Sequence, residues 1–145
     1  MKLTSPAFAD GAAIPERFTC EDEDVSPALA WTDVPAGTTS FALICDDPDA
    51  PGKTWVHWVV WGIPPTTTVL PEGFDGASQG LTDFRRTGYG GPCPPPGKPH
   101  RYYFKLYALT EPLALAPRAT KADLERAMDG KVLASATLMG TFDRS

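Results

Sequence analysis

The sequence lacks any hydrophobic run long enough to cross a bilayer. Apolar residues make up 42% of its 145 residues but are dispersed in short runs, whereas a membrane-spanning helix needs about 20 in succession. The first fifteen residues also lack the basic and continuous apolar segments of a signal peptide. We therefore expect a cytoplasmic protein with no integral membrane association. The length fits one domain, residues 1–145, with its own core.

Basic stripes and paired cysteines are missing too. The net charge is −5, with an acidic cluster at residues 21–24, so we expect no binding to nucleic acid. The cysteines, Cys20, Cys45 and Cys93, are odd in number and do not have Cys-x-x-Cys spacing. This pattern argues against a disulfide framework and a structural zinc site. We expect reduced thiols, no metal and no cofactor.

Proline, by contrast, is abundant at 16 residues, against an average usage of about 5%. Alternating β-branched and aromatic residues predict strands at 39–45, 54–63 and 101–109. Weaker strands are predicted at 17–20 and 29–34, and 131–142 fits a strand or a helix. One helix is predicted at 120–129, where Thr120 and Asp123 have capping-box spacing. The fold class is therefore mostly β.

The chain contains only two histidines, His57 and His100, and both lie at strand ends beside loops rich in proline and glycine. Five prolines fall within residues 91–99 and hold the start of the strand at His100 rigidly, because proline has few conformations to lose. The unpatterned stretch 64–100 is long enough to indicate a functional or mobile loop.

Side chains can be assigned to strand faces by alternation. His100 and Tyr102 point to one side of their strand, and Asp47 ends the inner face of the strand at 39–45. The predicted face of the strand at 54–63 consists of Trp55, His57, Val59 and Trp61. Both histidines, an aspartate, a tryptophan and a tyrosine thus emerge beside the loops and form a candidate site.

Three other interpretations stay open at this point. His57 could be a core histidine and Asp47 a turn cap, with the prolines only ending strands. Asp47, His57 and His100 have the composition of an iron site, but no arginine or second carboxylate for a cosubstrate accompanies them. Cys93 could act as a nucleophile with His100, but no acidic residue that would orient the pair is evident.

Two segments carry a family resemblance. "DDPDAPGKTWVHWVVWGIP" and "GYGGPCPPPGKPHRYYFKLYAL" resemble the signature blocks of the phosphatidylethanolamine-binding protein family, also called Raf kinase inhibitor proteins, in its bacterial and archaeal branch. The likeness extends over essentially the whole chain. It implies a β-sandwich with one or two short helices near the C-terminus and a small pocket for phosphate, acetate or a phosphorylated head group.

The resemblance also implies which residues form the pocket: Asp47, Trp55, His57, Gly91, Pro92, His100 and Tyr102. Imidazole N–H groups and the tyrosine hydroxyl would donate to the anion, and Asp47 would orient a histidine and favour its charged form. Gly91 would allow close approach of the ligand, and Trp55 would form an apolar wall.

The expected function is non-enzymatic binding of an anion or phosphoryl ligand, on a phosphorylated small molecule or protein group. Modulation of a kinase or protease and a homodimer are implied by the resemblance alone. The alternative is a small-molecule enzyme that uses His57 and His100 as acid and base. Saturable binding without turnover distinguishes the first from the second, because fold alone does not decide between them.

Overall fold

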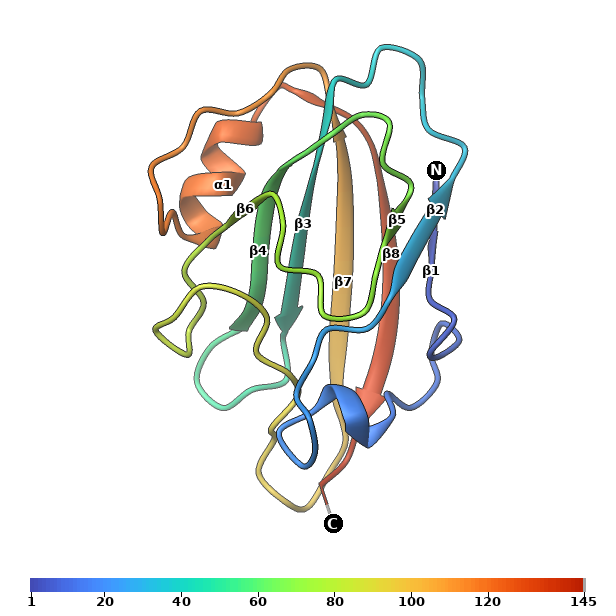
Figure 1. Cartoon of the computed structure of the whole chain (residues 1–145). Coiled ribbons are helices and arrows are strands. Elements are labelled where there is room, and N and C mark those ends of the chain that lie inside the picture. The colour runs from blue at the N-terminus through green and yellow to red at the C-terminus, as the bar shows by residue number, and fades with distance from the viewer. Residues whose placement is uncertain (145) are drawn as a thin grey trace.

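The computed structural model describes residues 1–144, which form two antiparallel sheets (Figure 1). The small sheet has the order β1 (Lys2–Thr4), β2 (Leu29–Thr32), β5 (Val69–Leu70). The large sheet has the order β6 (Ser78–Gln79), β4 (Trp55–Ile63), β3 (Ser40–Asp47), β7 (His100–Leu109), β8 (Val132–Phe142). A short 3-10 helix, η1 (Glu16–Phe18), precedes β2, and α1 (Lys121–Met128) precedes β8.

The two faces of the large sheet pack against different parts of the chain. Its inner face and the small sheet enclose the main core, in which Trp31 of β2 packs edge-on against Phe41 of β3 at 5.3 Å. Its outer face packs Ile44 and Val59 against Leu124 of α1 in a second, smaller core. The predicted β-sandwich is therefore confirmed, with one helix layered on its outer face.

The helix begins where the sequence predicted it. The backbone N–H of Asp123 donates to the Thr120 hydroxyl over 3.2 Å, and the Thr120 N–H donates to the Asp123 carboxylate over 2.9 Å. This reciprocal capping box satisfies two of the N–H groups that a helix start leaves free. Leu124 and Met128 are buried against the sheet, so the apolar stripe of the helix is confirmed.

Most predicted strands are confirmed, and one is wrong. The strands predicted at 39–45, 54–63, 101–109 and 29–34 correspond to β3, β4, β7 and β2, and the ambiguous segment 131–142 is the strand β8. The segment 17–20 is not a strand, because η1 occupies its first half. There the N–H of Thr19 bonds back to the carbonyl of Glu16 over 2.9 Å, which closes a helical turn instead of a strand ladder. No helix in residues 1–144 is long and apolar enough to span a bilayer.

Candidate functional site: a cavity at the end of the large sheet

Asp47 is the last residue of β3 and is almost completely buried. One carboxylate oxygen accepts the backbone N–H of Asp49 over 2.7 Å, and the other accepts Nδ1 of His100 over 2.7 Å. The turn that follows β3 is therefore closed by the same side chain that contacts the histidine. Asp49 in turn binds Arg101 through the side chain and the backbone N–H, which holds this turn against the start of β7.

His100 begins β7 and has its ring fixed by Asp47. Because an ionised carboxylate only accepts hydrogen bonds, the proton of this contact lies on Nδ1 of His100. The Nε2 atom remains for a ligand, since it makes no hydrogen bond with any residue in 1–144. The contact between Asp47 and a histidine that the sequence analysis expected is therefore made by His100.

His57 lies at an irregularity of β4 that changes which way the following side chains point. Val56 pairs with Asp46 and Trp58 with Cys45, so His57 is an extra residue opposite one step of β3, which is the pattern of a β-bulge. The bulge shifts the alternation, and Trp58 joins the inner core while Val59 faces α1. The predicted face is thus wrong beyond His57.

The ring of His57 is buried and bound on one side. Its Nδ1 lies 2.6 Å from the carbonyl oxygen of Gly90, and because a carbonyl only accepts, Nδ1 carries the hydrogen. Burial lowers the pKa of His57 below its ordinary value of 6.5, although the Gly90 carbonyl and the Asp47 carboxylate act in the opposite direction. A neutral ring with hydrogen on Nδ1 presents Nε2 as a hydrogen-bond acceptor.

Tyr102 connects the two histidines. Its ring packs edge-on against His57 with 5.1 Å between ring centroids and lies nearly parallel to His100 at 6.5 Å. The hydroxyl is buried and has no hydrogen-bond partner among residues 1–144. Burial and the Asp47 carboxylate raise the pKa of Tyr102, so the hydroxyl stays protonated and can donate.

These groups line one cavity of about 280 Å³. Asp47, His57, His100 and Tyr102 supply its polar groups. Its other walls are Ala50, Pro51, Trp55, Phe84, Cys93, Pro94 and Pro95. Phe84 packs edge-on against both Trp55 and His57. The cavity therefore combines a few polar groups with a mainly apolar wall, as small-molecule sites do. Its lining contains no lysine or arginine from residues 1–144.

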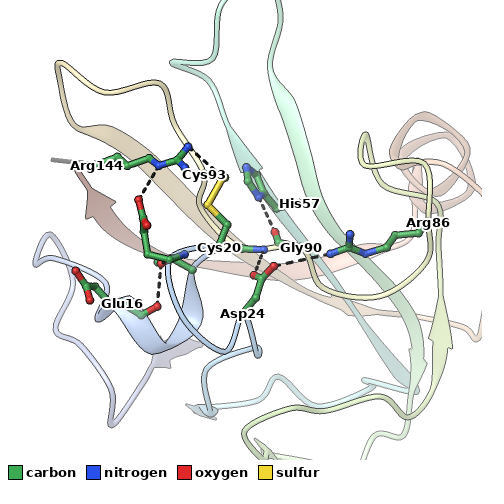
Figure 2. The surroundings of a disulfide bond; sticks show 11 residues. Glu16, Cys20, Asp24, His57, Arg86, Gly90, Cys93 and Arg144 are labelled. Carbon is green, nitrogen blue, oxygen red and sulfur yellow. Dashed lines mark hydrogen bonds and ion pairs between the residues drawn. A yellow bond between two sulfur atoms is a disulfide. The ribbon is translucent and has the colours of Figure 1, made fainter.

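Cys20 and Cys93 form a disulfide, so the prediction of reduced thiols is wrong for both (Figure 2). Their Cα atoms lie 5.4 Å apart, a separation that a disulfide spans without moving the backbone. The bond ties the segment after η1 to the proline-rich loop, and Cys93 forms part of the cavity wall. A catalytic Cys93 thiol is thereby contradicted. Cys45 is free and buried, and burial raises the pKa of its thiol.

Gly91 and Pro92 are not among the residues that line the cavity. The N–H of Gly91 donates to Asp24 over 2.8 Å, and the carbonyl of Pro92 accepts the N–H of Cys20 over 3.1 Å. A Cβ atom on Gly91 would lie 2.2 Å from the Phe18 carbonyl oxygen. In this structure Gly91 thus allows the close approach of protein backbone, and its predicted contact with a ligand stays a prediction.

Sequence reasoning missed Phe84, the largest wall residue outside the strands. It lies in the unpatterned segment 64–100, where the only signal was the length of the loop. Its place depends on Gly90, because a Cβ atom there would lie 2.4 Å from the Phe84 ring. The same Gly90 provides the carbonyl for His57, so the two glycines of "GYGG" that precede Pro92 both serve packing around the cavity.

Residues 1–144 offer no set of side chains that is placed to bind a metal ion. Within the part of the chain that the structure describes, no three His, Cys, Asp or Glu side chains lie close enough to hold one ion. Asp47 and the Nδ1 atoms of both histidines are engaged in hydrogen bonds. The two imidazole rings and the Tyr102 side chain instead belong to the lining of one cavity.

Known proteins resemble this chain over nearly its whole length. The family model described as phosphatidylethanolamine-binding protein matches residues 4–143. The chain is 50% identical over 151 residues to a UPF0098 protein of Methanothermobacter thermautotrophicus, covering 99% of both chains. It is 49% identical over 152 residues to one of Aquifex aeolicus, covering 99% of this chain and 89% of the relative.

Solved structures agree with the sequence relatives. A putative phosphatidylethanolamine-binding protein homologue of Chlamydia trachomatis superimposes with a TM-score of 0.95 at 41% identity, over 99% of this chain and 97% of that one. YbcL of Escherichia coli, described as a member of the mammalian family, gives 0.92 at 35% identity, over 99% and 98%. Fold, sequence and signature segments thus agree, and this chain belongs to the phosphatidylethanolamine-binding protein family.

Proposed function

We propose that the cavity binds the phosphoryl group of a phosphorylated small molecule or protein side chain, without turning it over. The observation that carries this proposal is the Tyr102 hydroxyl, which is buried and unpartnered among residues 1–144. Buried polar side-chain atoms nearly always have a hydrogen-bond partner. A ligand oxygen between Tyr102, His57 and His100 would supply the partner that the protein does not.

The donor set suits an oxyanion. The Tyr102 hydroxyl can donate, and so can Nε2 of His100 when the ring is protonated beside Asp47. Hydrogen bonds between charged groups are shorter and stronger than neutral ones. The net charge of −5 gives no general attraction for anions, so affinity must come from these local groups.

The walls suit the group that carries the phosphoryl. Trp55, Phe84 and the prolines at positions 94 and 95 form a mainly apolar surface around the polar end. An aromatic or aliphatic substituent would bury apolar area there, and each buried methylene contributes about 0.8 kcal/mol. We infer a phosphate ester with a partly apolar carrier rather than a highly charged polyphosphate.

Three finer expectations accompany this proposal and stay predictions. Modulation of a kinase or protease requires a protein that delivers a phosphoryl group into the cavity. A homodimer is implied by the family resemblance. A cytoplasmic location would expose the Cys20–Cys93 disulfide to thiols that reduce most protein disulfides, so alkylation of these cysteines in fresh cell extract is a direct measure of the compartment.

The experiment is calorimetric titration of inorganic phosphate into the unmodified protein and into His57→Ala and His100→Ala. Loss of a hydrogen bond to a charged group costs about 1.5–3 kcal/mol, so each variant should bind about tenfold more weakly or worse. Arg126→Ala, on the exposed side of α1 and bonded only to Asp123, is the matched control and should keep full affinity.

Circular dichroism of each variant separates binding from folding. Unchanged affinity in both histidine variants would remove the proposal. Collapse of the fold would favour the view that both are core histidines. Turnover of a phosphate ester that both substitutions abolish would establish the enzyme alternative instead.

A further inference from the structure

The hydrogen atoms of the two histidines are fixed by different partners. Nδ1 of His57 faces the Gly90 carbonyl at 2.6 Å, and Nδ1 of His100 faces the Asp47 carboxylate at 2.7 Å. The Gly90 carbonyl accepts the Nδ1 hydrogen of His57 and brings no full charge to the ring. Burial lowers the pKa of His57, so this ring is neutral, with a lone pair on Nε2, and it needs a donor from the ligand.

We propose that the pocket recognises its ligand in a protonated form, as a phosphate monoester or inorganic phosphate that carries a P–OH group. The ligand hydroxyl donates to Nε2 of His57. Its remaining oxygens accept from the Tyr102 hydroxyl and from Nε2 of His100. This assignment rests on the proposed function and narrows it to a ligand class, because diesters and sulfates carry no such hydrogen.

The charged groups of the cavity also favour a phosphate ligand that carries a P–OH group. Among residues 1–144 no lysine or arginine lines the cavity, and Asp47 contributes a carboxylate, so this lining offers a doubly charged anion no permanent cation. Charged and titratable groups near His57 are Asp47 of β3, Asp24 of the segment after η1, and His100 and Tyr102 of β7. The more distant Asp46 is paired with Lys105 and Lys121. The Asp47 carboxylate, which belongs to the cavity lining, disfavours a dianion beside His57.

Binding of an anion that carries no proton costs free energy at His57. Its oxygens have only lone pairs, as does Nε2 of the neutral ring, so binding requires that His57 first take up a proton from water. Burial of the ring opposes that uptake and lowers the pKa of His57. A phosphate monoester, whose second ionisation lies near about pH 6, brings the proton with it.

A matched pair of ligands tests this directly. Methylphosphonate and methanesulfonate have the same shape, and at about pH 5.5 both carry one negative charge, but only methylphosphonate has a hydroxyl. Calorimetric titration should show methylphosphonate binding about tenfold more tightly or better, since an unpaired buried polar group costs that much. Equal affinities would overturn the proposal while leaving the anion site intact.

Substitution of His57 tests whether this residue causes the preference for methylphosphonate over methanesulfonate. In His57→Gln the side-chain amide can both donate and accept, so methylphosphonate and methanesulfonate should bind about equally. A preference that survives the substitution would show that the hydroxyl is recognised elsewhere and would overturn the assignment. Binding of neither ligand to the unmodified protein would refute the proposed function itself, and this inference with it.

Two further measurements use the unmodified protein and do not depend on His57→Gln. Methyl phosphate should behave like inorganic phosphate, whereas dimethyl phosphate, which models a lipid diester, should bind about tenfold more weakly. In the methylphosphonate complex, nitrogen NMR of the His57 ring should show hydrogen on Nδ1 and none covalently bound to Nε2. A doubly protonated His57 ring in that complex would contradict the proposal.

Discussion

Tyr102 is the residue at which stability and binding oppose each other. Its hydroxyl is buried without a partner among residues 1–144, and such a group costs about 1–3 kcal/mol. Tyr102→Phe removes the cost, so we expect a free energy of unfolding that is unchanged or higher. The same change removes a donor to the anion and should weaken phosphate binding. Urea unfolding and calorimetry measure the two effects.

Tyr89 is the matched control for this substitution. Its hydroxyl donates to the Phe18 carbonyl over 2.7 Å, and Tyr89 does not line the cavity. Tyr89→Phe should therefore lower stability by about 1 kcal/mol and leave phosphate affinity unchanged. A loss of stability in Tyr102→Phe as large as that in Tyr89→Phe would mean that the Tyr102 hydroxyl has a partner in the folded protein.

His57 makes the stability of the ligand-free protein depend on pH. Its folded pKa lies below the ordinary value of 6.5 because the ring is buried. As the pH falls below about 6.5, the unfolded chain binds a proton that the folded protein does not, so stability is full above this pH and declines below it. Urea unfolding between about pH 7.5 and 5 should show this decline in the unmodified protein and a smaller one in His57→Gln. Parallel curves for the two proteins would contradict the buried neutral ring.

At the scale of elements, the disulfide connects the segment after η1 with the proline-rich loop. The two cysteines are 73 residues apart. Closing a loop of that size lowers the entropy of the unfolded chain and so raises its free energy by about 4 kcal/mol. Replacing both Cys20 and Cys93 by serine should lower the free energy of unfolding by about 2–5 kcal/mol. It should also weaken phosphate binding, because Cys93 belongs to the cavity wall.

Chemical reduction of the unmodified protein provides the comparison for the disulfide. Reductant should destabilise it to the level of the double serine variant and leave that variant unaffected. Cys45 is a free thiol in both proteins, so the reductant does not change it. Equal stability with and without reductant would show that the two thiols are not joined in solution.

The alternating sequence pattern predicted where the strands lie better than it predicted which of their side chains face inward. β3 and β7 keep strict alternation as far as Asp47 and Tyr102, so their inward residues were predicted correctly. In β4 nearly every position is apolar, so the bulge at His57 leaves no mark in the pattern. A run that is apolar on both faces predicts a buried strand but not its register.

At the scale of the whole molecule, residues far apart in sequence come together in ways that no local pattern shows. Phe84 enters the cavity wall from a loop, and Cys20 meets Cys93 although neither has a short-range partner motif. Both depend on how the loops fold over the sheet. Asp47, Trp55, His57, His100 and Tyr102 were predictable because the ends of three neighbouring strands carry them to one edge, and the structure brings all five to one cavity.

The homodimer is a prediction at this scale. The second half of β8 is covered by the N-terminal segment, where Gly11 and Ile14 donate to Met139 and Thr141. Its first half is a sheet edge with Val132 and Leu133 exposed, and such edges favour pairing with another chain. Analytical ultracentrifugation should show a dimer that Leu133→Lys weakens. A monomer mass at all protein concentrations would contradict it.

The most direct test of the phosphoryl-binding pocket is a crystal structure of the protein grown with inorganic phosphate. The predicted result is a phosphate in the cavity, with oxygens within hydrogen-bond distance of the Tyr102 hydroxyl and of Nε2 of both His57 and His100. A cavity that holds only water at saturating phosphate, or phosphate bound elsewhere on the surface, would contradict the account.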